Sequence, residues 1–432
     1  MPSLKAERLE LKAVSDYARE RKRASENSRA AALDIVKEVR LRGFEAVREY
    51  SLRFDKVETG RKSVDASQEQ LLEAEASLSS GERDAMLEMK RRIARFASAQ
   101  KAALKEIVQA DAEGTTKLVF RPVRRVGIYV PAGRAPLFYS LFMAALPAIE
   151  AGVKEMVVCT PPQKDGKANS YVLAAANMCG VRKVLKIGGA QAIASMAFGL
   201  EGLLEPVDVI CGPGNAYVNG AKMAVAGMGA RIDVPAGPSE VLAVADCTAD
   251  PKFVAADMLA QAEHGADSAA VCICIGKEMA EKVACELQAQ LFALPKESPA
   301  RESIARWGRI WVAKNKEEAL EAANLMAVEH LEFFVSGAEK LAQRVCNAGA
   351  VFVRTAEAFC DYGMSGGNHI LPTGASARSW SGLSVQTFGK WIYVDEISGE
   401  AQRQLAEKTA LLARMEGLEA HARAAEARGK TR

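Results

Sequence analysis

Histidine is scarce in this chain, and its scarcity limits where acid–base or metal chemistry can lie. The 432 residues contain only four histidines, at positions 264, 330, 369 and 421. Histidine is the side chain whose charge changes nearest neutral pH, and it is the commonest protein ligand for metals. A catalytic base or a zinc site built on imidazole must therefore draw on His264, His330, His369 or His421.

Cysteine motifs are missing as well. Nine cysteines are present, but no two are spaced as a CxxC pair, which argues against a cysteine zinc knuckle or a thioredoxin-type site. Several lie inside apolar, strand-like runs such as Val271-Cys-Ile-Cys-Ile275. Scattered thiols in odd number are typical of a reducing compartment, so we expect a cytoplasmic protein.

Long apolar segments and a dominant charge sign are also lacking. No run approaches the roughly 18 apolar residues of a membrane helix, and the first residues, Met-Pro-Ser followed by charged positions, have no apolar core of a secretory signal. Lys and Arg number 57 against 54 Asp and Glu, a net charge of +3. We therefore expect neither a membrane span nor a nucleic-acid partner.

From about residue 118 onward, short apolar strands alternate with helices, and glycines follow several strands. Such alternation predicts parallel, doubly wound sheets. A first series runs to about residue 226, and a second series begins near residue 231. The predicted strands are 118–123, 126–130, 155–160, 183–187 and 207–211, then 241–245, 269–275, 309–313, 331–335, 349–353 and 392–397. The predicted helices are 135–151, 170–179, 190–199 and 216–226, then one ending near 265, 277–294, 316–326 and 338–348.

The two ends of the chain differ from this middle part. Residues 1–105 are charged and alanine-rich with helical periodicity, which predicts an amphipathic arm that packs on the body or on another subunit; residues 51–59 are expected to form a loop. The tail from Ser398 is charged and helical. Residues 359–373 are too rich in glycine for a helix or strand, and such loops often position functional groups.

The nucleotide signal is ambiguous at this point. Ligands of doubly wound sheets bind at the carboxyl ends of the strands, so the glycine turns are candidates for backbone contact with a phosphate. The dinucleotide fingerprint is absent, because Gly212-Pro-Gly214-Asn-Ala-Tyr217 has tyrosine where the third glycine belongs. A tight structural turn explains this segment equally well.

The stretch Asp257–Gly265 is the first candidate for a metal site. An apolar stripe predicts a helix that stops at Gly265, and on a helix Gln261 and His264, three positions apart, share one face. An imidazole nitrogen and an amide oxygen can bind a borderline metal such as Zn²⁺. The alternative is a buried helix end whose His and Gln bond to the backbone.

The other three histidines also have nearby acidic residues, in the pairs Glu329/His330, Asp361/His369 and Glu416/His421. Adjacent side chains such as Glu329 and His330 usually point in different directions, which suits two separate proton transfers, one from water and one from a substrate hydroxyl. Taken singly, each pair has an ordinary structural explanation: a surface or capping pair, a turn-forming aspartate, and a solvent-exposed histidine.

Eight segments in order resemble the histidinol dehydrogenase family, and the resemblance covers essentially the whole chain. They include Glu329-His330-Leu-Glu and Asn368-His369-Ile-Leu-Pro-Thr. The others are Arg121-Pro-Val with Val126-Gly-Ile-Tyr-Val-Pro-Ala-Gly, Gly188-Gly-Ala-Gln191, Gly212-Pro-Gly-Asn215-Ala-Tyr-Val, Asp233-Val-Pro-Ala-Gly-Pro-Ser239, Gln261-Ala-Glu-His264-Gly and Glu416-Gly-Leu-Glu-Ala-His421.

The resemblance implies a specific chemistry. Members of this family oxidise L-histidinol to L-histidine through histidinal, in two NAD-dependent steps, with one zinc ion per subunit. The implied zinc ligands are Gln261, His264, Asp361 and His421, the last from the neighbouring subunit of a homodimer. His330 resembles the base for the hydroxyl proton, and Glu329 resembles the base that activates water.

Further contacts and the fold are implied in the same way. The metal ligands and His330 would also contact substrate, together with Ser239, His369 and Glu416, while Tyr129, Gln191 and Asn215 would contact NAD. The implied fold is α/β, with two Rossmann-like doubly wound domains, an N-terminal helical arm and a small C-terminal helical tail. The predicted division is an arm at 1–25, a first domain at 26–133 and 240–385, a second at 134–239, and a dimer-exchanging tail at 386–432.

The chain departs from the family pattern at one loop. The family usually places histidine seven residues after the aspartate, whereas Asp361 and His369 are eight apart, and Cys360 replaces the usual glycine. Two alternatives therefore stay open. One is a relative that oxidises another primary alcohol or a diol, for example a sulfonated diol. The other is a zinc-free binding protein with a structural nucleotide pocket.

Overall fold

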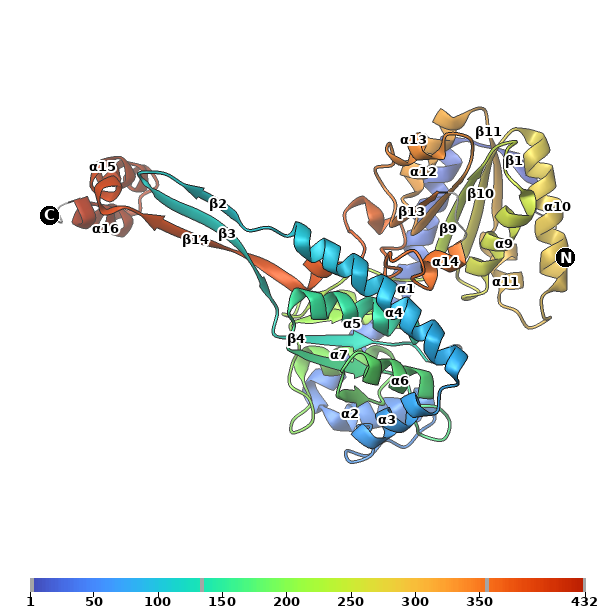
Figure 1. Cartoon of the computed structure of the whole chain (residues 1–432), viewed down its shortest axis with the longest axis horizontal. Helices are drawn as coiled ribbons and strands as arrows, with labels where there is room; N and C mark the ends of the chain where they lie inside the picture. Colours follow the sequence, from blue (N-terminus) through green and yellow to red (C-terminus); the bar gives the residue numbers. More distant parts are fainter. Residues whose placement is uncertain (1–3, 133–135, 354–356, 430–432) are drawn as a thin grey trace. The chain divides into compact units, whose positions relative to one another are not determined.

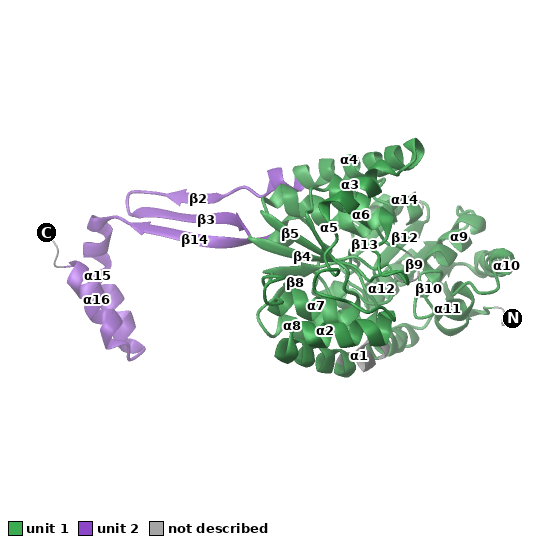
Figure 2. Ribbon diagram, turned by 90° about the horizontal axis from the view of Figure 1, so that it is seen from below, with its two compact units in different colours: residues 1–99, 123–388 green, residues 100–122, 389–432 purple. Residues whose placement is uncertain are grey.

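The computed structural model describes residues 4–132, 136–353 and 357–429, apart from the side chains of residues 24–29. The chain forms two compact units, one of residues 1–99 and 123–388 and the other of residues 100–122 and 389–432 (Figure 2). Both parallel sheets belong to the first unit. Gly133, the last residue of one motif, and the predicted domain boundary at 133/134 lie outside the described residues.

The first sheet has five parallel strands in the order β6-β5-β4-β7-β8. Counted along the chain from β4, the strands lie in the order third, second, first, fourth, fifth, as in a Rossmann-type sheet. The order in which successive strands are added reverses between β4 and β7. Its helices cover both faces (Figure 1). The elements are β4 (Arg125–Tyr129), α5 (Tyr139–Ala151), β5 (Glu155–Cys159), α6 (Ser170–Met178), β6 (Lys183–Leu185), α7 (Gly189–Phe198), β7 (Val209–Cys211), α8 (Ala216–Ala226) and β8 (Arg231–Ile232).

The second sheet repeats this order from β9 and adds the N-terminal strand at its edge, giving β1-β11-β10-β9-β12-β13, with every pair parallel. The predicted fold class is confirmed. The elements are β1 (Ala6–Arg8), β9 (Glu240–Ala245), α9 (Pro251–Ala262), β10 (Ala269–Ile275), α10 (Lys277–Ala293), α11 (Ala300–Trp307), β11 (Arg309–Ala313), α12 (Lys316–Met326), β12 (His330–Phe334), α13 (Ala338–Ala342), β13 (Ala350–Val353) and α14 (Glu357–Asp361).

The N-terminal helix α1 (Leu11–Arg42) contributes to the cores of both sheets. Val14 and Tyr17 are buried in the core around β10 and β11, while Val36 and Val39, about six turns further on, are buried against α7 and α8. The arm is therefore part of the body and continues well past residue 25. The helices after it are α2 (Phe44–Tyr50), a π-helix (Ser51–Asp55), α3 (Gln68–Ala76) and α4 (Ser80–Ala103).

A buried ion pair fixes the turn after β7. Lys222 Nζ lies 2.5 Å from Asp233 Oδ1, and both side chains are fully buried. The same ammonium donates to the carbonyl of Gly212, and the other Asp233 oxygen accepts the Gly212 N–H. Gly212 has φ of +117°, and a Cβ there would lie 2.1 Å from the Tyr129 carbonyl oxygen, so only glycine fits where β7 ends beside β4.

Substituting Lys222 with methionine is expected to destabilise the protein by about 3–5 kcal/mol, because it leaves the Asp233 carboxylate buried without its cation. Urea unfolding followed by circular dichroism measures the change. The matched control is Lys222→Met combined with Asp233→Asn, which removes both charges and keeps an acceptor for Gly212; it should recover part of the loss. A single variant with the wild-type midpoint would show that the pair contributes nothing.

The second unit contains an antiparallel sheet and two helices. The sheet has the order β14-β3-β2, with Trp391 opposite Phe120 in the register. Its elements are β2 (Ile107–Ala110), β3 (Gly114–Pro122), β14 (Gly389–Ile397), α15 (Gly399–Met415) and α16 (Glu419–Gly429). Many apolar side chains of this small unit are exposed: Ile107, Val108, Ile392, Tyr393, Val394, Ile397, Leu411, Leu412 and Met415.

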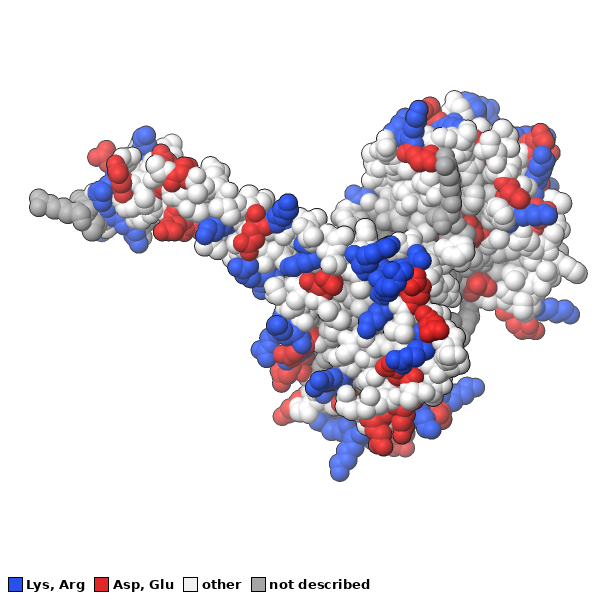
Figure 3. Space-filling model, in the orientation of Figure 1, with Lys and Arg blue, Asp and Glu red and all other residues white. Residues whose placement is uncertain are grey.

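The surface carries no dominant charge in the view of Figure 3, where acidic and basic side chains are interspersed. Among the described residues, no helix combines the length and the apolarity that a membrane crossing needs. No disulfide joins any cysteine that the structure describes.

Several local predictions were wrong. The segment 51–59 was expected to be a loop, but 51–55 form a π-helix, and the helix expected at 338–348 ends at Ala342. Residues 359–361 were expected to be non-helical but belong to α14, since the glycines begin only at Gly363. The strand β4 pairs with β5 and β7, so it lies in the sheet of the predicted second domain although the boundary at 133/134 assigned it to the first. The remaining domain boundaries stay a prediction.

Candidate active site

A cavity in the first unit lies where the two parallel sheets meet. Its volume is about 50 Å³. The first sheet contributes residues that follow its strands, including Tyr139 and Pro213. The second sheet contributes residues at the amino ends of β9 and β12, namely Ser239, Glu329 and His330. The cavity is also lined by Leu137, Ala236, Gly237, Gln261, His264, Asp361, His369, Ile370 and Leu371.

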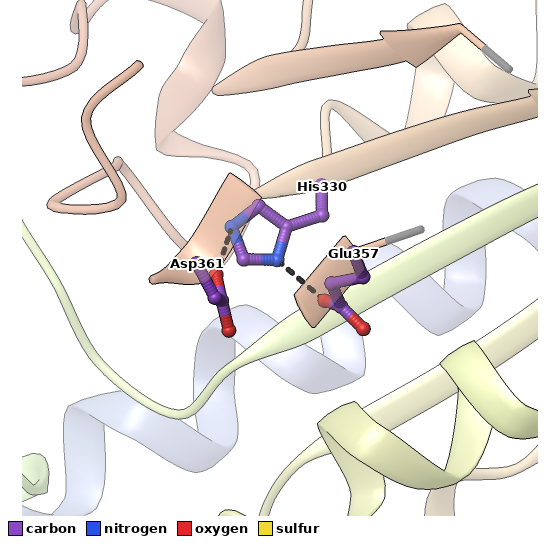
Figure 4. A group of neighbouring side chains, drawn as sticks. All are labelled: His330, Glu357 and Asp361. Atoms are coloured by element: carbon purple, nitrogen blue, oxygen red, sulfur yellow. Dashed lines mark hydrogen bonds and ion pairs between the residues drawn. The ribbon is translucent and has the colours of Figure 1, made fainter. Parts of the chain in front are cut away.

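His330 stands at the centre of the polar groups. It is the first residue of β12, and its side chain is only 3% exposed. Figure 4 shows a carboxylate facing each ring nitrogen: Nδ1 lies 2.9 Å from Glu357 Oε1, and Nε2 lies 3.7 Å from Asp361 Oδ1. The Nε2 atom is buried and has no hydrogen-bond partner among the described residues. It is therefore free to accept a proton from a ligand in the cavity.

The predicted metal ligands Gln261, His264 and Asp361 converge on this cavity. His264 Nε2 lies 3.8 Å from Asp361 Oδ2, too far for a hydrogen bond. The Gln261 Oε1 atom is buried and has no partner among the described residues. These atoms, an imidazole nitrogen, a carboxylate oxygen and an amide oxygen, suit Zn²⁺. The three residues thus fit the predicted metal.

The helix that carries Gln261 ends earlier than expected. Residue Ala262 is the last in α9, so His264 lies two residues beyond the helix and not on the same helical face as Gln261. The alternative of a helix end that is satisfied by its own backbone does not account for the unpartnered oxygen of Gln261.

Glu329 differs electrostatically from its neighbour. Burial raises the pKa of Glu329 to about 8, although the nearby His330 and a backbone donor lower it. That donor is the Glu240 N–H, which lies 2.9 Å from Glu329 Oε2 and orients the carboxyl group. A carboxyl group with this pKa is a stronger base than an ordinary glutamate, and it loses that function as the pH falls below about 8.

His369 lines the cavity with both ring nitrogens engaged. Nδ1 lies 2.9 Å from the Asp361 carbonyl oxygen, to which it donates, so Nε2 accepts from the Ser140 hydroxyl at 3.0 Å. Burial lowers the pKa of His369 to about 4, which keeps the ring neutral. The hydrogen bond to the Asp361 carbonyl joins the two ends of the loop from Asp361 to His369.

The predicted nucleotide contacts lie at the carboxyl edge of the first sheet. Tyr129 ends β4, Gln191 lies in α7 after β6, and Asn215 caps α8 by accepting from the backbone of Tyr217 and Val218. Gly189 donates its N–H to the Tyr129 hydroxyl at 3.1 Å. The amide oxygen and nitrogen of Gln191 are buried and have no partners among the described residues, so a ligand could bond to both.

Two predicted residues, Glu416 and His421, belong to the second unit. Both are exposed, Glu416 at the end of α15 and His421 in α16. The first unit therefore brings together Ser239, His369, Glu329, His330 and three of the four predicted metal ligands, while Glu416 and His421 are described apart from them.

The sequence did not point to Glu357, which contacts His330 and also accepts a hydrogen bond from the Gln261 amide nitrogen. Its contacts follow from α14, a short helix on which residues four apart lie on the same face. The interval of four between Glu357 and Asp361 is the signal that could have identified it, and the expectation of a glycine-rich loop hid this signal.

Comparisons with known proteins agree on one family. The profile described as histidinol dehydrogenase matches residues 18–429. A histidinol dehydrogenase of Legionella pneumophila (strain Paris) is 41% identical over 406 residues, covering 92% of each chain. One from Xanthomonas euvesicatoria is 42% identical over 400 residues, covering 92% of this chain and 91% of its own. The crystal structure of histidinol dehydrogenase from Elizabethkingia anophelis superposes with a TM-score of 0.86 at 34% identity, covering 92% of this chain and 91% of that chain.

Two Rossmann-type sheets with histidine and carboxylate side chains in the cavity where they meet are the architecture of a dehydrogenase. The comparisons specify which kind. This chain belongs to the histidinol dehydrogenase family. The predicted family and the predicted enzyme class, an NAD-dependent dehydrogenase, are confirmed.

Proposed function

We propose that this chain oxidises L-histidinol to L-histidine through histidinal, in two NAD-dependent steps with one zinc ion per subunit, as part of histidine biosynthesis. The observation that carries the proposal is the convergence of unpartnered atoms on one cavity. Gln261 Oε1 and His330 Nε2 lack partners among the described residues, and both line the space that His264 and Asp361 also face.

Gln261, His264 and Asp361 would hold the zinc, with His421 of a second copy as the fourth ligand. When bound, the ion supplies a Lewis acid that fixes the amino and imidazole nitrogens of the substrate. The carboxylate of Asp361 supplies the negative charge of the set, while Gln261 and His264 are neutral ligands. Ser239 and Glu416 complete the proposed substrate contacts.

Glu329 and His330 would divide the proton transfers. In the first oxidation, His330 Nε2 accepts the hydroxyl proton of the alcohol. In the second, the Glu329 carboxylate takes a proton from the water that adds to the aldehyde. Both side chains are buried, so neither needs to be withdrawn from bulk water as the reaction proceeds.

Tyr129, Gln191 and Asn215 would bind NAD, which accepts a hydride in each oxidation. The edge that they occupy is continuous with the cavity, because Pro213 follows Gly212 at the end of β7 and lines the cavity wall. A nucleotide site on this edge does not need the G-x-G-x-x-G motif, since Gly212 already allows β7 to end close to β4.

A homodimer would supply the missing ligand. The second unit carries His421 and Glu416, and it exposes apolar residues on both its sheet and its helices, such as Tyr393 at 70% and Met415 at 75%. Exposed apolar surface of this kind on a small unit suits burial against another protein. A second copy of the chain is the partner that would use those residues. The absence of disulfides among the described cysteines suits the cytoplasm, where we place the protein.

The alternative substrate, another primary alcohol or a diol, is favoured by one observation. Asp361 and His369 are eight residues apart where seven are usual, and the loop between them borders both the proposed zinc and the substrate. The hydrogen bond from His369 to the Asp361 carbonyl shows that the longer loop still closes.

The decisive measurement is NADH formation from L-histidinol, before and after treatment with a chelator. We expect about two NADH per histidinol, loss of activity in the chelator, and recovery on addition of Zn²⁺. Oxidation of other alcohols and sulfonated diols, assayed in parallel, tests the alternative substrate. Activity that survives complete removal of the metal would contradict the role of zinc. Oxidation of a diol but not of histidinol would overturn the proposed substrate.

A further inference from the structure

A short helix presents two carboxylates to one histidine. The helix α14 spans only Glu357–Asp361, so its first and last residues are four apart and lie on the same face. The ring of His330 lies between them, with Nδ1 toward Glu357 and Nε2 toward Asp361 (Figure 4). On the proposed function, Asp361 is a metal ligand, which leaves Glu357 without an assigned task.

Glu357 contacts two functional side chains through the same atom. Its Oε1 oxygen accepts a hydrogen bond from Gln261 Nε2 and lies 2.9 Å from His330 Nδ1. The carboxyl group is completely buried. Burying such a group is costly unless it is hydrogen-bonded, so its contacts to Gln261 and His330 account for its position.

We propose that Glu357 is a positioning residue that holds His330 and Gln261 in their working orientations, an inference that rests on the proposed function of both. It keeps the proton of His330 on Nδ1, so that Nε2 is the free base. It also holds the amide nitrogen of Gln261, so that the amide oxygen faces the metal site.

Two side chains lie within hydrogen-bond distance of His330 Nδ1: Glu357 Oε1 at 2.9 Å and Gln261 Nε2 at 2.8 Å. An amide nitrogen can only donate, so Glu357 Oε1 is an acceptor toward Gln261. The proposal assigns the tautomer in which Nδ1 carries the proton and donates it to that oxygen, 2.9 Å away. The neutral ring then has no proton on Nε2, the atom that lacks a partner among the described residues. A carboxylate that orients an imidazole from its other nitrogen is a recurrent device in catalysis.

The orientation of Gln261 follows from the same oxygen. Because Nε2 donates to Glu357, the atom left for a ligand is Oε1, which is buried and unpartnered among the described residues. Carboxylates that orient metal ligands from behind change metal affinity by about 10–100-fold when they are removed. Glu357 would act in this way on the glutamine.

The neighbouring residues hold Glu357 in place. The Asp257 carboxyl group, on α9, accepts a hydrogen bond from the Glu357 backbone N–H and so anchors the start of α14. Phe352, on β13, packs against the His330 ring with the ring centroids 5.2 Å apart. The ring therefore cannot rotate freely to exchange its two nitrogens.

Two substitutions at Glu357 test the proposal in the full-length protein. Glu357→Met removes both oxygens; it should weaken Zn²⁺ binding by about 10–100-fold, measured by competition with a chelating dye, and lower kcat about 100-fold. Glu357→Gln keeps an acceptor oxygen and should recover most of both losses. The matched control is Glu332→Met, because Glu332 lies two residues along β12, is as buried as Glu357, and makes no side-chain hydrogen bond to His330 or Gln261 within the described part of the chain. It should change either quantity less than threefold. Equal losses in Glu332→Met and Glu357→Met would overturn the proposal.

A double substitution separates the two tasks of Glu357. In a His330→Ala background, Glu357→Met should not lower kcat further when kcat is measured at saturating Zn²⁺, where the metal site is full. The loss of Zn²⁺ affinity should persist in that background, because it acts through Gln261. The proposal is overturned if Glu357→Met lowers kcat by the same factor in both backgrounds.

The tautomer can be observed without any change at Glu357. With four histidines in the chain, ¹⁵N spectra of the metal-free protein are sparse, and His330→Ala identifies the His330 signals. We expect Nδ1 to carry the proton; a neutral ring protonated at Nε2 would refute the proposal even if Glu357→Met failed to fold. The spectra and the Zn²⁺ affinities can be measured without turnover. If the wild-type protein did not oxidise L-histidinol, the proposed function would be wrong, but these two measurements would still test the role of Glu357.

Discussion

Substituting His330 with alanine is expected to lower kcat for L-histidinol by about 10²–10⁴-fold, the usual contribution of a general base, while zinc stays bound. The reason is positional: His330 lines the cavity, its Nε2 has no hydrogen-bond partner in the described part of the chain, and His330 is outside the set of proposed metal ligands. Steady-state NADH formation and metal analysis of the same sample give the two quantities. Loss of zinc together with activity would make His330 a ligand instead of a base.

Glu329→Gln is the companion variant, because it changes one atom of the neighbouring residue and can retain the hydrogen bond from the Glu240 N–H. With histidinal as substrate, Glu329→Gln should be impaired more than His330→Ala, since the aldehyde step needs an activated water and not a base for the alcohol. Near-normal rates in both variants would remove these two residues from the mechanism.

The second large effect is expected from mixing two inactive variants. His421→Ala and His264→Ala should each abolish nearly all activity, because each removes one proposed zinc ligand. If the site is completed by a second copy, half of the dimers in an equal, re-equilibrated mixture pair the two variants, and one of the two sites in each is intact. Activity should then return to about one quarter of the wild-type value.

Controls for the mixture are each variant alone, taken through the same exchange procedure, and a mixture of His421→Ala with a Gln261→Ala/His421→Ala double variant, which has no intact combination of ligands. A mixture that stays inactive, although exchange is shown by mass spectrometry, would mean that His421 completes the site of its own chain or has no role in it.

Part of the regular fold was predictable from the sequence to the residue. Four elements have the predicted bounds: α8 at 216–226, β10 at 269–275, β11 at 309–313 and α12 at 316–326. Each is short, has a single apolar pattern and is bounded by residues that favour turns or caps. Asn215 and Asn315, for example, accept hydrogen bonds from the first turns of α8 and α12.

The antiparallel sheet was predictable only in part: strands were expected at 118–123 and 392–397, where β3 and β14 lie, but β2 and the pairing were not expected. β2 and β14 are mostly exposed in the second unit, so their sequences lack the alternation that burial of one face imposes. The pairing of β14 with β3 also joins residues more than 260 positions apart, as in Trp391 opposite Phe120. Local patterns contain no information about such pairing.

The site was predictable only in its residue types. The short list of histidines and the family resemblance identified His264, His330 and Asp361, and the structure shows them around one cavity. The tautomer of His330, the direction of the Gln261 amide and the part played by Glu357 depend on how α14, α9 and β12 approach one another. These are properties of packing between distant segments, which a single sequence does not display.

The helix α1 joins the cores of the two parallel sheets whose residues line the cavity. It is anchored at one end by Tyr17, whose hydroxyl donates to the Trp307 carbonyl, and at the other by Val36 and Val39 beneath the first sheet. Its 32 residues form a strut about 48 Å long between the two sheets. Because α1 is packed against both sheets, we expect it to resist their separation more than a rotation of one sheet relative to the other about the helix axis. We therefore expect substrate and product to pass through the loops at the rim of the cavity, so that substitutions in those loops change the rate of passage.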